Sequence, residues 1–202
     1  MGEKLALNKS TLNREAKKLR AYRQFVPALD LKRKQLMAAR VSVRQQLSEQ
    51  QAELDAVRAF VRRELPMIAA QEVDLNSLVQ LKKVEVVYTN LVGLQLPFVG
   101  EFEVEIQQYS KLASPIWFDL WLEKLQSALR LQVEMRVAMR RLALLESGLQ
   151  KTTQRLNLFD KVLIPQAEKN IRKIRIALSD AERAGVVRAK IAKGKRMKVA
   201  MR

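Results

Sequence analysis

The first third of the chain repeats apolar residues at alternating steps of three and four. Twelve of the 17 positions in this series, which runs from Leu5 to Val61, are apolar. This spacing keeps one stripe facing a partner helix and predicts a left-handed coiled coil. Asn8, Ser10 or Thr11 is a candidate cap, Leu65-Pro66 is a stop signal, and Pro27 predicts a local bend. The series is Leu5, Asn8, Leu12, Glu15, Leu19, Tyr22, Val26, Leu29, Arg33, Leu36, Arg40, Val43, Leu47, Gln50, Leu54, Val57 and Val61.

A second series follows Ser114-Pro115, where a capping serine precedes a proline that has no backbone donor to lose. Only Lys124 and Thr152 are polar among its 14 positions, and the register passes Gly148 without a break. Pro165 predicts a kink, after which the phase shifts. The positions are Trp117, Trp121, Lys124, Ala128, Leu131, Met135, Ala138, Leu142, Leu145, Leu149, Thr152, Leu156, Phe159 and Leu163, then Ala167, Ile171, Ile174, Leu178 and Ala181.

The middle of the chain holds most of the strand-like sequence. Phe102, Val104 and Ile106 alternate with Glu101, Glu103 and Glu105, which predicts a strand with one apolar and one acidic face. We expect Leu91–Leu96 to be its partner strand, with a turn at residues 97–100, and a short helix around Ser77–Tyr88. The carboxylate row is expected to be a solvated face and not an acid pair or cation site.

The predicted fold class is mainly α: a long antiparallel two-helix coiled coil with a small β-hairpin in the middle of the chain. The expected parts are a first helix (1–64), a middle segment (65–114), a second helix (115–185) and a basic tail (186–202). Helices of roughly 90 and 100 Å exceed the radius of gyration of about 16–17 Å for a compact domain of this size, so a rod is expected.

Composition excludes several kinds of chemistry. The 202 residues contain no Cys and no His, which removes disulfides, thiol chemistry, His-Cys zinc sites and His-based catalysis. The six glycines never cluster into a phosphate-binding loop. No catalytic residue, cofactor or metal ligand is therefore predicted. Trp117 and Trp121 are expected in the core, while Arg33 and Arg40 either reach water or meet partner carboxylates.

The net charge of +17 points to an acidic partner. Residues 64–114 carry a net −4, whereas residues 186–202 carry seven basic side chains and no acidic one. From this pattern a protein-interaction rod and a basic coiled-coil nucleic-acid-binding protein both remain open, although the tail lacks aromatic residues for stacking. The candidate contact residues in the tail are Arg188, Lys190, Lys193, Lys195, Arg196 and Lys198.

Targeting signals are not recognisable. The start lacks the apolar run of a signal peptide, and the longest uncharged run is 15 residues, too short to span a bilayer that needs about 20. We expect a cytoplasmic protein.

Residues 152–184 resemble the signature of the D subunits of V-type (vacuolar/archaeal-type) ATPases and ATP synthases, in their bacterial-like form. The matching segments are Arg155-Leu156-Asn157, Ile164-Pro165 and Ile171 to Ile174. Residues 7–12 and 29–36 resemble the family's opening motif and its Leu-Lys-x-Lys-Arg stretch, whereas Pro27 and Gly185 depart from its helices. The signature positions are Arg155, Asn157, Ile164, Pro165, Ile171 and Ile174.

This resemblance implies a non-catalytic rotor shaft in the central stalk, which couples rotation of an ion-translocating membrane ring to ATP synthesis or hydrolysis. The implied partners are catalytic and non-catalytic head subunits, the F subunit of the stalk and a membrane-ring adaptor. The implied location is cytoplasmic and peripheral to the membrane, without direct insertion, and no nucleic acid is expected.

Overall fold

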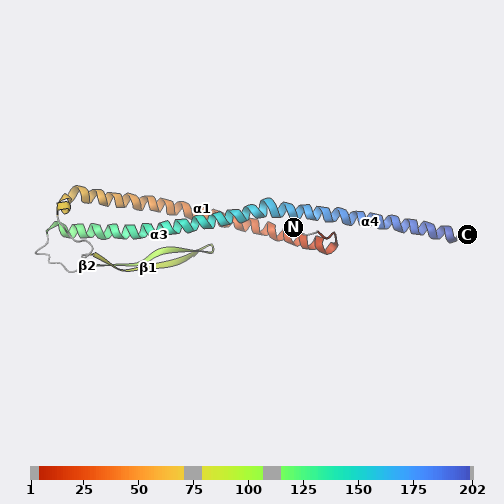
Figure 1. Ribbon diagram of the computed structural model, residues 1–202, viewed down its shortest axis with the longest axis horizontal. Coiled ribbons are helices and arrows are strands. Elements are labelled where there is room, and N and C mark those ends of the chain that lie inside the picture. The colour runs from red at the N-terminus through yellow and green to blue at the C-terminus, as the bar shows by residue number, and fades with distance from the viewer. Residues whose placement is uncertain (1–4, 71–78, 107–114, 201–202) are drawn as a thin grey trace. The chain divides into compact units, whose positions relative to one another are not determined.

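The computed structural model describes residues 5–70, 79–106 and 115–200, with the side chains of residues 69–70 and 198–200 outside that description. Its elements confirm the predicted class of long helices with a two-stranded hairpin between them (Figure 1). In chain order they are α1 (Lys9–Glu64), the 3-10 helix η1 (Pro66–Ala70), β1 (Val79–Leu91), β2 (Leu94–Ile106), α3 (Trp117–Leu158), the π-helical turn η2 (Phe159–Leu163) and α4 (Ile164–Ala200).

The chain divides into two compact units. The hairpin unit is Lys32–Lys151, and the terminal unit joins Met1–Leu31 with Thr152–Arg202. Both α1 and α3 continue from one unit into the other. Each unit therefore contains one segment of α1 together with one helical segment from the second half of the chain.

Both helical stripes lie where the periodicity predicted them. Every position of the first series except Asn8 is buried or half-buried, as is every position of the second series up to Leu163. Asn8 caps α1 instead, because its Oδ1 accepts the backbone N–H of Thr11 at 2.7 Å. The predicted stop is also confirmed, since α1 ends at Glu64, directly before Leu65-Pro66. Ser114, the expected cap of the second helix, lies outside the described residues.

The helices accommodate Pro27 and Pro165 in different ways. α1 continues through Pro27. Ahead of Pro165 the helix widens into η2, where the N–H of Ile164 reaches back five residues to the carbonyl of Phe159. A π turn adds one residue to the helix, which accounts for the predicted phase shift to Ala167 and Ile171. α4 then runs past Gly185 and Gly194 to Ala200.

The hairpin corrects three predictions. Described residues of Ser77–Tyr88 form β1 and not a helix, while residues 91–96 contain the turn and residues 97–100 lie inside β2. The turn is the Val92-Gly93 pair, which has φ of 52° and 79° as a type I′ turn requires. Asn90 supports it by accepting the N–H of Gly93 at 2.7 Å. Irregularities in the pairing between Leu81 and Lys83 and between Val84 and Val86 interrupt the alternation of β1.

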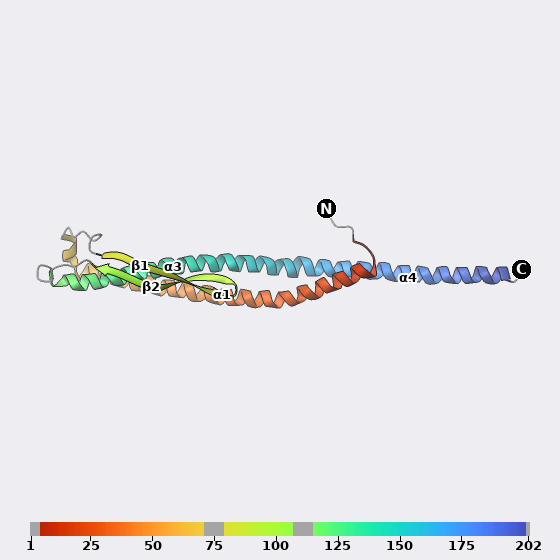
Figure 2. The same ribbon diagram turned by 90° about the horizontal axis from the view of Figure 1, so that it is seen from below.

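Within the hairpin unit, β1 and β2 run alongside α3 and the second half of α1 (Figures 1 and 2). One apolar cluster joins the hairpin tip to both helices through Leu36, Leu96 and Leu145. A second cluster at the hairpin base contains Leu65, Phe118 and Trp121, with Trp117 packed against it, which confirms the tryptophans as core residues. The hairpin is thus fixed to the helices at both of its ends.

Candidate functional site

The end of α4 is the most exposed part of the terminal unit. Every residue from Val186 to Met197 is exposed, and this stretch runs beyond the start of α1 in both views (Figures 1 and 2). Successive helical residues turn by about 100°, so the basic positions from Arg188 to Lys198 are distributed around the whole circumference of α4. An isolated helix with this charge is marginally stable in water. The described basic side chains are Arg188, Lys190, Lys193, Lys195 and Arg196, and the side chain of Lys198 lies outside the described residues.

The family-signature residues occupy two kinds of position. Ile171 and Ile174 are buried in the seam between α1 and α4, with Ile174 fully enclosed. Ile164 is half-buried, whereas Arg155, Asn157 and Pro165 are exposed. Pro165 and Ile164 border η2, whose Phe159 ring contacts Tyr22 edge-on at 5.4 Å between centroids. The signature residues therefore lie around the π turn and in the seam that follows it, and they do not line one common pocket.

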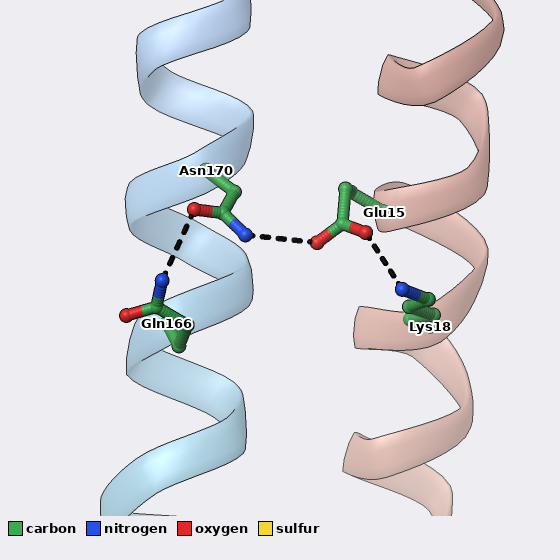
Figure 3. A network of polar contacts seen from close by, with 4 residues as sticks. All are labelled: Glu15, Lys18, Gln166 and Asn170. Atoms are coloured by element: carbon green, nitrogen blue, oxygen red, sulfur yellow. Dashed lines mark hydrogen bonds and ion pairs between the residues drawn. The ribbon is translucent and has the colours of Figure 1, made fainter. Parts of the chain in front are cut away.

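A polar network crosses the seam close to the signature (Figure 3). Glu15 is only 5% exposed, accepts a hydrogen bond from the Lys18 ammonium at 2.9 Å and accepts another from the Asn170 amide at 3.2 Å. The Lys18 contact is the main reason that the pKa of Glu15 lies below its ordinary value; burial opposes it and Asn170 adds to it. Gln166 bonds Asn170 at 3.3 Å from one turn earlier in α4.

This network gives the seam a polar layer with a defined partner. A buried polar residue at a seam position favours one register of a helix pair, because any slip leaves it unpaired. Gln50 repeats the arrangement in the hairpin unit, where its amide donates to Glu134 at 3.0 Å. Sequence periodicity had marked Glu15 and Gln50 as polar seam positions, but it gave no sign of their partners.

Arg141 forms a junction in the hairpin unit that the sequence did not reveal. It is 8% exposed, donates through Nε to the carbonyl of Pro97 at 3.1 Å and places its guanidinium 3.9 Å from the centre of the Phe98 ring. A longer contact of 3.5 Å reaches Gln46 of α1. Burial lowers the pKa of Arg141, yet a guanidinium remains charged in proteins. One side chain thus ties β2 to both helices.

The other predicted features lie in the hairpin unit. Glu101, Glu103 and Glu105 are exposed while the alternating apolar residues are half-buried, which confirms the solvated acidic face. Lys83 bonds Glu101 at 2.6 Å, and this contact raises the lysine's pKa. Arg33 and Arg40 are half-buried and keep part of their surface in water.

Neither a metal-binding cluster nor a membrane-spanning helix occurs in the described ranges. Residues 5–70, 79–106 and 115–200 hold no group of three or more acidic, His or Cys side chains placed to bind a metal ion. None of the described helices is both long and apolar enough to cross a membrane.

Comparison with known proteins agrees with the signature. A sequence model of the ATP synthase D subunits matches residues 11–194. The V-type ATP synthase D subunit of Borreliella burgdorferi is 30% identical over 195 residues, covering 96% of each chain. The V-type ATP synthase D subunit of Chlamydia pneumoniae is 30% identical over 199 residues, covering 96% of this chain and 94% of the relative. The chain therefore belongs to the family of V-type ATP synthase D subunits.

Proposed function

We propose that this chain is the central-stalk rotor shaft of a V-type ATP synthase or ATPase, a non-catalytic component that couples turning of an ion-translocating membrane ring to ATP synthesis or hydrolysis. Its partners are catalytic and non-catalytic head subunits, the F subunit of the stalk and a membrane-ring adaptor. It works at the cytoplasmic side of the membrane, held there by the complex. The observation that carries the proposal is the exposed basic end of α4 in a member of this family.

The terminal unit has the properties that a turning element in a protein sleeve needs. Its cations surround the end of α4, so attraction to an acidic lining persists at every angle. Exposed ion pairs are individually weak, about 0–1 kcal/mol, which allows contacts to exchange as the helix turns. The charge therefore attracts the helix without fixing it at one angle.

The seam and the hairpin supply stiffness. Burial of apolar residues along the seam resists twisting of one helix about the other, and the Glu15–Asn170 layer resists sliding. In the hairpin unit, Arg141 and the Leu36–Leu145 cluster add β2 as a third packed element. Each catalytic site in the head then meets a different face of the shaft. The shaft shifts the conformational equilibrium of that site, because it contacts one conformation of the site better than another.

Purification through a tag on this chain tests the proposal. Two large ATPase head subunits are expected to accompany it, in amounts that fall as salt rises, because the contact is electrostatic. Purification without such partners contradicts the proposal. If assembly does not change with ionic strength, the electrostatic part of the proposal is contradicted, whereas the role as rotor shaft still stands.

Deletion of residues 186–202 separates this role from nucleic-acid binding. The shortened chain should couple ATP hydrolysis to rotation less well, with little change in retention on duplex DNA. A nucleic-acid-binding protein would instead lose tight DNA binding that falls steeply with the logarithm of salt concentration.

A further inference from the structure

We propose that a groove on one side of the terminal unit, the arginine groove, binds an acidic protein segment that inserts an apolar side chain between its walls. The groove has a volume of about 480 Å³. Its walls carry Arg20 and Arg23 from α1 and Arg172 and Arg175 from α4, and its floor includes Leu19 and Ile171. The inference deepens the proposed function, on which it rests, by naming the chemistry of one partner contact.

All but one of the charged side chains that line the groove are positive. Residues flanking a coiled-coil seam usually attract one another across it, and like charges there are destabilising. Glu168 is the single carboxylate of the groove lining, and it bonds Arg23 at 2.7 Å. Among the described residues no ion pair is formed by Arg20, Arg172 or Arg175. Three guanidinium groups therefore face this groove with their bidentate hydrogen-bonding capacity available to carboxylates.

The pocket around Glu15 in the same unit shows that this imbalance is local. That pocket, of about 370 Å³, mixes the cations Arg14 and Lys18 with Glu15, Gln166 and Asn170. Its central charge is satisfied within the chain, as described above. The same two helices therefore present one pocket with two cations and one carboxylate, and one groove with four cations and one carboxylate.

The floor of the arginine groove selects protein over nucleic acid. Ile176, at the groove, is 57% exposed although it is a large apolar side chain. A phosphate backbone has no apolar group to cover it, and no aromatic side chain among the lining residues is available to stack a base. A protein segment that carries carboxylates beside an apolar side chain satisfies both the walls and the floor.

Because the groove lies on one side of the helix pair, it also has a consequence for rotation. A surrounding set of repeated acidic segments would each meet the groove at a different angle of the shaft. Only the segment facing the groove would gain the apolar and bidentate contacts, whereas the basic end of α4 attracts at all angles. The groove thus supplies the differential contact that a rotor needs.

Charge reversal in the groove tests the proposal. The variant Arg20→Glu/Arg172→Glu is compared with Lys17→Glu/Lys169→Glu, which makes the same charge change at exposed positions of the same helices outside both pockets. The measurement is binding of each full-length chain to the isolated ATPase head at several salt concentrations. The groove variant should bind about tenfold more weakly or worse, and the control within about twofold of the unsubstituted chain.

Two further measurements test whether the groove variant is folded and whether the partner is a protein or a nucleic acid. The groove variant should unfold at the same temperature as the unsubstituted chain or higher, because reversal removes like-charge repulsion, so weaker binding will not reflect unfolding. Ile176→Ser should weaken head binding and leave retention on duplex DNA unchanged. Equal losses in the groove and control variants would overturn the proposal, as would an unaffected groove variant or a groove-dependent loss of DNA binding. If the unsubstituted chain does not bind the head at all, the proposed function itself fails.

Discussion

The hairpin unit and the terminal unit use the same two helical stripes in different ways. In the hairpin unit the stripes are covered by a third element, and Leu36 and Leu145 are fully enclosed. In the terminal unit two helix segments share a seam that includes a buried carboxylate, and α4 ends in an exposed basic stretch. The two units therefore differ in packing: a third element encloses the seam of the hairpin unit, whereas the terminal unit keeps a polar layer in its seam and an exposed basic helix end.

The largest expected effect concerns the two cores. Leu145 and Ile174 are both fully enclosed, one in each unit. Leu145→Ala should lower the free energy of unfolding by about 4 kcal/mol, because neighbours from three elements cannot collapse into the cavity, and Ile174→Ala by about 2–3 kcal/mol. Urea denaturation gives both values. If Ile174→Ala costs as much as Leu145→Ala, the third element adds no rigidity.

The next effect sharpens the role of the hairpin junction. Arg141→Met keeps an apolar stem but leaves the Pro97 carbonyl without its donor, and it should cost about 1–3 kcal/mol. The neighbouring exposed Arg140→Met is the matched control and should cost no more than about 0.5 kcal/mol. Amide exchange across β2 should quicken only in the Arg141 variant. Equal exchange in the two variants would show that Arg141 does not hold the hairpin.

Two helical glycines should respond differently to the same substitution. A Cβ at Gly148 would overlap the Cδ1 of Leu94 at the hairpin tip, whereas a Cβ at Gly185 meets nothing within 4 Å. Gly185→Ala should therefore stabilise by about 0.5–1 kcal/mol through helix propensity, whereas at Gly148 the Leu94 side chain must move to admit the Cβ, which should offset that gain by about 1 kcal/mol. Thermal unfolding measures both, and equal stabilisation at the two positions would contradict the tight seating of the tip.

The smallest effect is the pH dependence of the terminal unit. The pKa of Glu15 is lower in the folded chain than in the unfolded chain. Its contribution to the free energy of unfolding is therefore complete above the pKa of the unfolded carboxyl, and it is lost as the pH falls through the lower pKa of the folded state. Glu15→Gln should cost about 1 kcal/mol near neutral pH and reduce the loss of stability on acidification. Glu182→Gln, at an exposed site of α4, controls for the change in net charge. Identical acid unfolding of the two variants would mean that the seam layer adds no stability.

The sequence predicted the helical seams well because burial in a helix pair repeats every three and four residues. Even polar members such as Glu15 and Gln50 are buried where the series placed them. Their partners depend on the relative register of two distant segments, which periodicity along one helix does not contain. Arg141 was missed for a related reason: it lies beside seam residue Leu142, and only the seated hairpin encloses it.

The hairpin itself was predicted, but the bounds of its strands and turn were wrong because its local signals conflict. Val92 adopts a positive φ that β-branched residues rarely take, so Val92-Gly93 did not indicate a turn. Irregular pairing around Lys83 hides the alternation of β1, and Pro97 with Gly100 imitates a turn inside β2. Gly100 lies where a Cβ would stand 2.8 Å from a methyl of Val87, a cross-strand constraint that local sequence does not show.

Rotation is the property that most directly tests the account. The chain has no native Cys, so Ser48→Cys in the exposed part of the hairpin unit provides one attachment point for a bead. With the ATPase head fixed to a surface, ATP should drive the bead in one direction around the head. A bead that stays fixed while the same heads hydrolyse ATP would contradict the assignment of this chain as the shaft.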